Sequence, residues 1–269
     1  MQGGASSIFC LGLVCIFFPG TLFAQTAAEE DLSAHFGAYS GAFALFDSRE
    51  NRWLRYHAQQ CQIRSTPCST FKVLNSLIAL ETGIADGPNF ALRWDGIKRP
   101  IEAWNRDQTL RSAFAVSCLW YYENLAARIG LERYKRILAE VRYGNGDVTG
   151  GLPHFWLESS LMISPDEQVD FLHRLYARKL PFSAKTVDTV LDIMTLSRDG
   201  GTTLRGKTGT AGDPMKDIAT LGWFIGSVST ESGDCFFATR ITGGENPSGR
   251  TARKITESIL ASLKVFPAR

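Results

Sequence analysis

Apolar and polar positions follow two different periods along this chain, and the change between them divides it into three parts. Residues 40–57 hold two apolar runs around a polar turn at residues 48–51, which predicts a pair of strands. Strand-like runs return at residues 201–210, 219–229 and 234–241, where Gly, Asp, Ser and Pro separate them. We therefore expect strands at both ends of the chain.

The middle of the chain and its last segment show the longer period of amphipathic helices. Ser164 and Glu167 form a capping box around Pro165, which predicts a helix start at that point. Gly83 and Gly130 act as stop signals for earlier helices. The predicted helical segments are residues 69–82, 111–130, 131–146 with a turn at its end, 167–179, 184–196 and 250–265.

This order of elements predicts an α/β protein of the α+β type. The late strands are joined by short connections, which implies antiparallel pairing. The simplest architecture is one antiparallel sheet built from both ends of the chain and flanked by helices. The helices of the middle segment then form a helical subdomain, and a cleft is expected where the two parts meet.

Composition suits a single globular domain and excludes several kinds of partner. The chain has 269 residues, of which 44% are hydrophobic and 21% charged, with a net charge of +2. Acidic and basic residues are interspersed, so we expect neither nucleic acid nor a membrane surface as a partner. The histidines His35, His57, His154 and His173 show no metal-ligand spacing, and no metal is expected.

The N-terminus differs from the rest and predicts export. Residues 8–18 form an unbroken apolar run that is too short to span a bilayer, and small Ala24 follows a Pro-Gly pair. We expect residues 1–24 to be a signal peptide, and residues 25–269 to be one domain without stable membrane association. No Lys or Arg precedes the run, so an uncleaved anchor is the alternative.

Export would leave four cysteines in an oxidising compartment, because Cys10 and Cys15 would be removed with the signal peptide. The remaining cysteines include Cys61 and Cys68, which flank a turn-like segment. A Cys61–Cys68 disulfide is our hypothesis, although spacing alone does not give connectivity. Whether Cys118 keeps a free thiol is left open.

Ser69 and Lys72 are the first residues that could carry chemistry. Three residues apart on a helix, they share one face, and a serine hydroxyl needs a nearby base to become a nucleophile. Burial among apolar neighbours would lower the pKa of Lys72 and let it act as that base. A Ser cap followed by a surface lysine is the alternative, because this motif alone is common.

Other segments place polar groups where a cleft could use them. The triplet Lys207-Thr208-Gly209 ends a predicted strand, where a glycine permits close approach of a ligand. Ser117 lies in an apolar stretch and needs either a helix back-bond or a role in proton transfer. Trp156 is most simply a core aromatic whose N–H requires an acceptor. Arg250 adds a cation at a helix start, where the dipole disfavours it.

These motifs together resemble the class D (oxacillinase-type) serine β-lactamases. The residues that carry the resemblance occur in the order and approximate spacing of that family and span essentially the whole mature chain. They are Ser69-Thr70-Phe71-Lys72, Ser117-Cys118-Leu119, Tyr143-Gly144-Asn145, Trp156-Leu157 and Lys207-Thr208-Gly209. Leu119 departs from the usual valine, which puts substrate range in doubt rather than the class. The resemblance implies a serine β-lactamase/DD-peptidase-like fold.

The resemblance also implies a role for each matching residue. Ser69 would become acylated by a β-lactam. Lys72 would be carboxylated by carbon dioxide, and the resulting carbamate would be the general base. No cofactor apart from this carbon dioxide is expected. Trp156 would hydrogen-bond the carbamate, and Ser117 would relay a proton to the lactam nitrogen. The backbone N–H groups of Ser69 and Thr210 would form the oxyanion hole, and Lys207, Thr208 and Gly209 would line the pocket. Arg250 would bind the substrate carboxylate, with Arg253 as the fallback. Leu119 and Leu157 would form an apolar lid over the carbamate.

Three functions share this pocket. The leading prediction is a periplasmic enzyme of a Gram-negative bacterium, monomeric or homodimeric, that hydrolyses β-lactam antibiotics and confers resistance. A penicillin sensor would be acylated without turnover, and a peptidoglycan transpeptidase or carboxypeptidase would merely be inhibited. Trp156, Leu119 and Leu157 favour the first reading because they fit a carbamate site. The range of substrates is not predicted.

Overall fold

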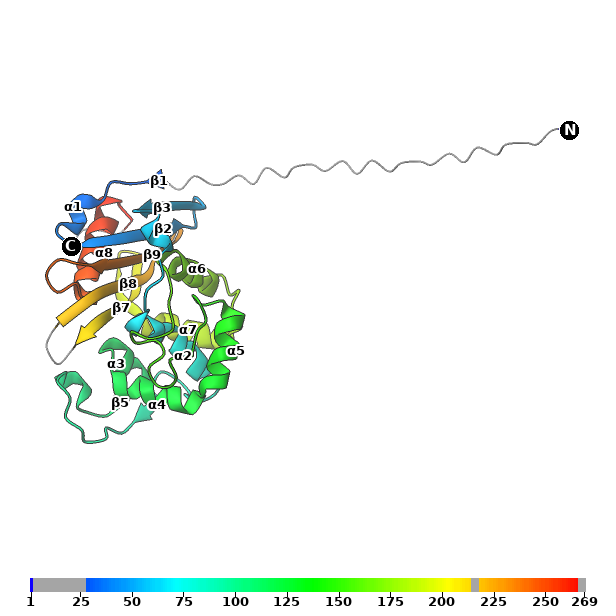
Figure 1. Ribbon diagram of the computed structural model, residues 1–269, viewed down its shortest axis with the longest axis vertical. Coiled ribbons are helices and arrows are strands. Elements are labelled where there is room, and N and C mark those ends of the chain that lie inside the picture. The colour runs from blue at the N-terminus through cyan, green and yellow to red at the C-terminus, as the bar shows by residue number, and fades with distance from the viewer. Residues whose placement is uncertain (2–27, 214–217, 266–269) are drawn as a thin grey trace.

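A seven-stranded sheet forms the centre of the protein, as the computed structural model shows for residues 28–213 and 218–265, together with Met1 (Figure 1). Its strand order is β1-β3-β2-β9-β8-β7-β6. Only β1 and β3 pair in parallel among these strands, and the other described pairs are antiparallel. The strands are β1 (Ala28–Glu29), β2 (Ser40–Asp47), β3 (Arg52–Tyr56), β6 (Thr195–Asp199), β7 (Thr202–Asp213), β8 (Ile218–Thr230) and β9 (Gly233–Thr242). The prediction of an antiparallel sheet built from both chain ends is confirmed.

Helices cover both faces of this sheet, which is why its central strands are apolar on both sides. Neighbouring residues of β9 face opposite layers: Phe236 belongs to the core beneath the helical part, and Phe237 to the core beneath α8 (Gly249–Ser262). On the first face, α6 (Pro165–Tyr176) packs against β2, β8 and β9. The alternation expected of strands thus divides the interior into two apolar cores.

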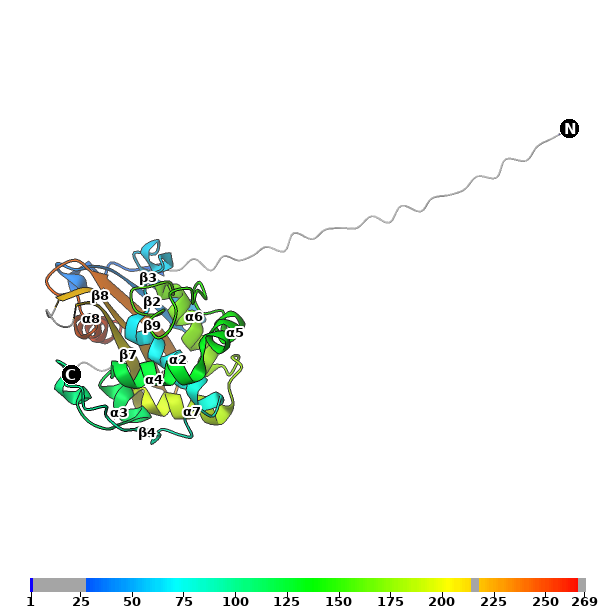
Figure 2. The same ribbon diagram turned by 60° about the horizontal axis from the view of Figure 1, so that its bottom comes forward.

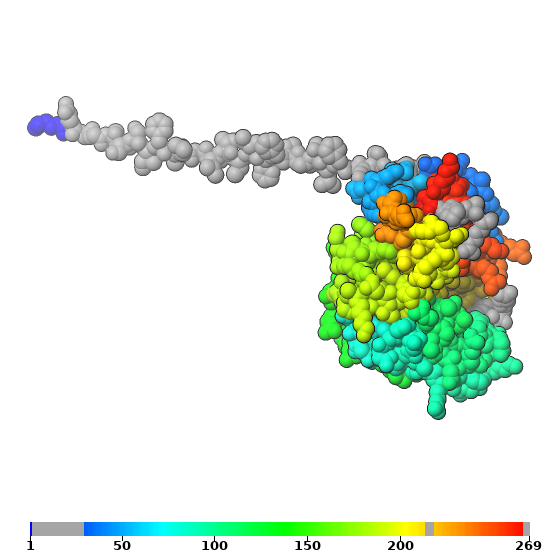
Figure 3. Space-filling view, turned by 180° about the vertical axis from the view of Figure 1, so that it is seen from behind, coloured from blue at the N-terminus to red at the C-terminus, as the bar shows by residue number. Residues whose placement is uncertain are grey.

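The helical part lies at one end of the sheet, with α2 (Lys72–Glu81) packed against α4 and α7 (Figure 2). In the view from behind, its cyan-to-green residues gather below the yellow residues of β6 (Figure 3). A small two-stranded sheet pairs β4 (Ala91–Leu92) with β5 (Gln108–Thr109). The other helical elements are α1 (Ser33–Phe36), η1 (Gln60–Gln62), η2 (Cys68–Phe71), η3 (Glu102–Trp104), α3 (Leu110–Ala115), α4 (Leu119–Ile129), α5 (Leu131–Val141) and α7 (Ala184–Ile193).

Two predicted helices differ from the structure at functionally placed residues. The segment predicted as one helix over residues 111–130 is two helices, because Ser117 adopts a left-handed backbone with φ of 57° between α3 and α4. The helix expected to begin at Ser69 begins instead with the 3-10 turn η2. The capping box of Ser164 and Glu167 is confirmed.

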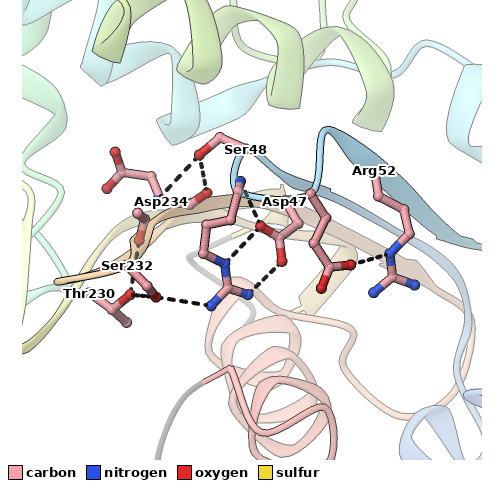
Figure 4. A network of polar contacts seen from close by, with 9 residues as sticks. Asp47, Ser48, Arg52, Thr230, Ser232 and Asp234 are labelled. Carbon is pink, nitrogen blue, oxygen red and sulfur yellow. Dashed lines mark hydrogen bonds and ion pairs between the residues drawn. The ribbon is translucent and has the colours of Figure 1, made fainter.

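A polar network holds the β2–β3 turn against the hairpin that joins β8 and β9 (Figure 4). The Ser48 hydroxyl donates to the Asp234 carbonyl and accepts from its N–H, which joins the β2–β3 turn to the start of β9. Arg49 donates to the Asp47 carboxylate through Nε at 2.8 Å, and this contact lowers the pKa of Asp47. The network holds the ends of the central strands β2 and β9 together and touches none of the predicted site residues.

No helix in residues 28–213 or 218–265 has the length and hydropathy needed to cross a bilayer. The predicted signal peptide, with its cleavage near Ala24 and the cysteines Cys10 and Cys15, lies outside the described residues.

Candidate active site

Ser69 and Lys72 lie at the junction of η2 and α2 and are in direct contact. The Lys72 Nζ donates to the Ser69 Oγ at 2.8 Å. Lys72 is buried, whereas Ser69 is half-buried and so remains accessible from one side. The alternative of a serine cap with a surface lysine is excluded by this geometry, because η2 has no side-chain cap and Lys72 is not on the surface.

The environment of Lys72 favours its neutral form. Burial lowers the pKa of Lys72 to about 8, because a desolvated ammonium is unstable relative to the free amine. Its Nζ lies 5.2 Å from the ring centroid of Tyr122. Among the described residues, no carboxylate forms a hydrogen bond or ion pair with it. The amine is therefore able to act as a base or to react with an electrophile.

Ser117 and Lys207 lie across from this pair and also contact each other. The Lys207 Nζ donates to the Ser117 Oγ at 3.1 Å and to the Thr208 carbonyl at 2.9 Å. Burial lowers the pKa of Lys207 well below its ordinary value, and the charge of Lys72 lowers it further. The left-handed turn at Ser117 thus brings its hydroxyl to a lysine instead of to the helix back-bond that we considered.

Gly209 explains how β7 comes so close to residues 67–70, which carry the candidate nucleophile Ser69 and are called the nucleophile turn below. A Cβ on Gly209 would lie 2.9 Å from the Pro67 carbonyl oxygen and 3.2 Å from the Thr70 nitrogen. On the other side of β7, the Thr210 hydroxyl accepts from the Gly249 N–H at 2.9 Å, which ties the strand to the start of α8. This spacing sets the distance between the backbones of Ser69 and Thr210.

Replacing Gly209 by alanine tests this spacing. The added methyl group would push β7 away from η2, and a displacement of about 1 Å at a catalytic centre can reduce the rate about 100-fold. We expect Gly209→Ala to lower kcat/KM by about 10- to 100-fold. Gly87→Ala is the control, since no atom lies within 4 Å of its added Cβ. Full activity of Gly209→Ala would show that the close approach is unimportant.

Trp156 is fully buried, and its indole nitrogen has no acceptor within the described part of the chain. Its ring stacks on Phe71 at a centroid distance of 5.5 Å and meets Phe155 edge-on at 5.0 Å. The Trp156 carbonyl accepts from the Cys68 N–H at 3.1 Å, which places the tryptophan beside the nucleophile turn. A buried donor without an acceptor is costly, so this indole N–H is an unsatisfied group beside the turn that carries Ser69.

The Tyr143-Gly144-Asn145 motif closes the loop that carries Trp156. Asn145 Oδ1 accepts from the Met162 N–H at 2.9 Å, and its Nδ2 donates to the Ser160 carbonyl at 2.8 Å. Gly144 has φ of 55°, and a Cβ there would lie 2.0 Å from the Met162 carbonyl oxygen. The motif is therefore structural, and it fixes both ends of the loop.

The remaining predicted residues are half-buried and adjoin the groups above along the chain. Thr208 is half-buried beside Lys207 on β7, and Leu157 is half-buried against the core next to Trp156. Leu119 is half-buried at the start of α4. The apolar lid of Leu119 and Leu157 stays a prediction.

The two arginines at the start of α8, Arg250 and Arg253, differ in the hydrogen bonds and ion pairs that they form. Arg253 Nε donates to Glu257 at 2.8 Å, and its guanidinium lies 5.8 Å from the Phe224 ring centroid. Arg250 is exposed and forms no hydrogen bond or ion pair with any described residue. Arg250 is therefore the arginine available to a ligand.

Two residues near the site were not predicted from the sequence. The Glu158 carboxylate accepts from the Gly212 N–H at 2.8 Å and joins the Trp156 loop to the end of β7. Gln168 is fully buried on α6 and donates to the Thr70 hydroxyl at 2.9 Å. A polar residue on the apolar face of the predicted helix was the available signal for Gln168.

The predicted Cys61–Cys68 disulfide is wrong for this structure. The Cys61 sulfur donates to the Phe43 carbonyl at 3.3 Å, whereas the Cys68 sulfur contacts the Thr66 hydroxyl at 3.8 Å. The two sulfurs point to different partners because η1 packs Cys61 against the sheet. Cys118, beside Ser117, is a buried free thiol whose pKa burial raises to about 11.

A half-buried serine in contact with a buried lysine, close to a second serine–lysine pair, is typical of serine acyl-transfer enzymes of the penicillin-recognising fold. Residues 29–261 match the family model described as the penicillin binding protein transpeptidase domain. The chain is 43% identical over 220 residues to the probable β-lactamase YbxI of Bacillus subtilis, covering 82% of this chain and 79% of that protein. The chain therefore belongs to the class D β-lactamases, and it is a β-lactamase hydrolase.

Solved structures and a second group of relatives agree with this assignment. A class D β-lactamase from Bacillus subtilis superposes with a TM-score of 0.83 at 40% identity, covering 89% of this chain and 98% of that one. The regulatory protein BlaR1 of Bacillus licheniformis is 36% identical over 255 residues, which span 94% of this chain but 41% of BlaR1. The relatives of this chain thus include both β-lactamases and a regulatory protein.

Proposed function

We propose that the protein hydrolyses β-lactam antibiotics through an acyl-enzyme on Ser69. The observation that carries this proposal is the 2.8 Å contact between the Lys72 amine and the Ser69 hydroxyl, in surroundings that lower the pKa of the amine to about 8. A serine hydroxyl becomes an effective nucleophile only when a base within hydrogen-bond reach accepts its proton.

Acylation follows from the positions of four polar groups. The Ser69 oxygen attacks the lactam carbonyl carbon while its proton passes toward Lys72, and the N–H groups of Ser69 and Thr210 stabilise the oxyanion. The lactam C–N bond then breaks, and the leaving nitrogen takes a proton relayed through the Ser117 hydroxyl, which Lys207 holds at 3.1 Å. Water later attacks the Ser69 ester and releases a ring-opened acid.

The residues around Lys72 fit its carboxylation by carbon dioxide. A neutral amine reacts with carbon dioxide, and the product would supply a carboxylate that accepts and returns protons in both half-reactions. The unsatisfied Trp156 N–H would gain an acceptor, and Lys207 would gain an attractive charge in place of a repulsive one. Both changes relieve unfavourable features of the pocket.

Substrate binding is assigned to the β7 residues across from Ser69 and to the exposed start of α8. Lys207, Thr208 and Gly209 would line the pocket beside the substrate carboxylate, and exposed Arg250 would bind that carboxylate as a charge-assisted pair. Leu119 and Leu157 would exclude water from Lys72. We further propose a periplasmic location after removal of residues 1–24, a monomeric or homodimeric state and a role in antibiotic resistance.

A penicillin sensor is the second candidate, and one observation favours it. The C-terminal domain of the Bacillus licheniformis BlaR penicillin receptor superposes with a TM-score of 0.85 at 36% identity, covering 93% of this chain. A sensor would be acylated at Ser69 in the same way, but would retain the acyl group.

Turnover of a chromogenic cephalosporin by the purified protein separates the two candidates. We expect sustained hydrolysis over many equivalents, and greater activity with added bicarbonate at acidic pH, because bicarbonate supplies carbon dioxide to Lys72. A burst of one equivalent without a steady state would support the sensor instead. Indifference to bicarbonate would contradict the carboxylation of Lys72.

A further inference from the structure

We propose that Gln168 is a positioning residue for the nucleophile, holding the turn that presents Ser69 from a helix far along the chain. The inference rests on the proposed acylation of Ser69 but assigns a role to a residue outside the motifs described above. Gln168 lies on α6 and is fully buried. Thr70 and Tyr143 are buried too, with exposed fractions of 0% and 1%. Of the side-chain partners of Gln168 among the described residues, Thr70 is the one next to Ser69.

A chain of hydrogen bonds runs from the core to that turn. The Tyr143 hydroxyl donates to Gln168 Oε1 at 3.4 Å, and Gln168 Nε2 donates to the Thr70 hydroxyl at 2.9 Å. The Thr70 hydroxyl in turn donates to the Pro67 carbonyl at 2.7 Å. The last bond closes a ring around Cys68 and Ser69, so the chain fixes the shape of the turn that holds the nucleophile.

The direction of these bonds is determined by the chemistry of their ends. The Pro67 carbonyl can only accept, so the single Thr70 hydroxyl proton is committed to it. Thr70 must then accept from its other side-chain neighbours, Gln168 and Tyr143, and the amide NH₂ of Gln168 donates to it at 2.9 Å. An acceptor in place of this NH₂ would compete for the Thr70 proton and weaken the turn.

The turn has reason to need external support. Cys68 adopts a left-handed backbone with φ of 47°, which is unfavourable for a residue with a Cβ. The Pro67 carbonyl oxygen, the Thr70 Cγ2 and the Thr70 nitrogen are also the atoms nearest to a Cβ built on Gly209. Relaxation of the turn would therefore change both the Ser69 hydroxyl position and the spacing between the Ser69 and Thr210 backbones.

Gln168→Met tests the proposal, because methionine fills a similar volume without a hydrogen-bonding amide. Gln108→Met is the matched control: Gln108 is buried, donates to the Ala103 carbonyl at 2.7 Å and accepts from Ser112 at 2.7 Å. The readout is the single-turnover rate at which a fluorescent penicillin labels Ser69. We expect Gln168→Met to label about tenfold more slowly, and Gln108→Met to label at the wild-type rate despite a similar loss of thermal stability.

Gln168→Glu supplies a readout that a purely structural role would not give. An ionised glutamate presents only acceptors to Thr70, whereas a protonated one can donate as the amide does. The measured quantity is the labelling rate of Gln168→Glu divided by the wild-type rate at the same pH, both with saturating bicarbonate. We expect this ratio to be near one at pH 5.5 and to fall about tenfold by pH 9.

The outcomes decide between positioning and mere packing. Equal slowing by Gln168→Met and Gln108→Met, or no slowing by either, overturns the proposal. If Gln168→Met does not fold, a constant rate ratio for Gln168→Glu across the pH range overturns it. Wild-type protein that is not labelled at all would contradict the proposed function and overturn this proposal with it, whereas a fault in the proposal alone appears only in the variants.

Discussion

Lys72→Met is expected to acylate Ser69 at least about 1,000-fold more slowly than wild type, since general-base assistance contributes about 10²–10⁴-fold to such steps. Methionine keeps the length and apolar stem of lysine but has no amine to accept the Ser69 proton. Among the described residues, the Ser69 hydroxyl forms a hydrogen bond with Lys72 at 2.8 Å and with no other base. The measurement is the rate of labelling by a fluorescent penicillin under single-turnover conditions.

The same substitution should make the protein more stable. Lys72 is buried without a carboxylate partner, and its pKa is lower in the folded chain than the ordinary value of 10.5. A group with a lowered amine pKa opposes folding at every pH where the unfolded chain would be protonated. We expect a higher melting temperature for Lys72→Met than for wild type at pH 6.5 without bicarbonate.

Opposite changes in rate and stability distinguish a functional lysine from a structural one. Arg174→Met is a suitable control, because Arg174 is half-buried on α6, is paired with Asp170 at 2.7 Å and has no predicted role in binding or catalysis. It should lose little labelling rate and gain no stability. Retention of more than a tenth of the wild-type labelling rate by Lys72→Met would show that another group serves as the base.

Local patterns in the sequence were sufficient for most of the fold. The polar turn at residues 48–51 and the runs around it predicted β2 and β3, and the capping box predicted the start of α6. The serine–lysine spacing predicted the contact between Ser69 and Lys72, because three residues along a helix is a local distance.

Features that depend on distant contacts were missed. The apolar pattern runs unbroken through residues 111–130, so nothing local marks the left-handed turn that Ser117 adopts to reach Lys207. The disulfide hypothesis failed because sequence spacing carries no information on where η1 places Cys61. The bond from Gln168 to Thr70 joins residues 98 positions apart and required the packing of α6 to be known.

Trp156→Phe is expected to slow deacylation by about 10- to 100-fold while changing acylation by less than about threefold. Phenylalanine preserves the contacts with Phe71 and Phe155 but removes the one indole N–H in this region that lacks an acceptor. If that N–H holds a carboxylated Lys72, its loss lets the carboxylate revert to the amine. Deacylation suffers more, because water must be activated without the ring strain that assists acylation by a β-lactam.

Trp120→Phe is the matched control for this prediction. Trp120 is also buried, but its indole N–H donates to the Trp104 carbonyl at 2.9 Å, so its removal should leave the ratio of the two rates unchanged. High bicarbonate should restore much of the deacylation rate of Trp156→Phe, since mass action opposes loss of the carboxylate. Equal slowing of both steps, without rescue, would mean that Trp156 serves only to pack beside Phe71.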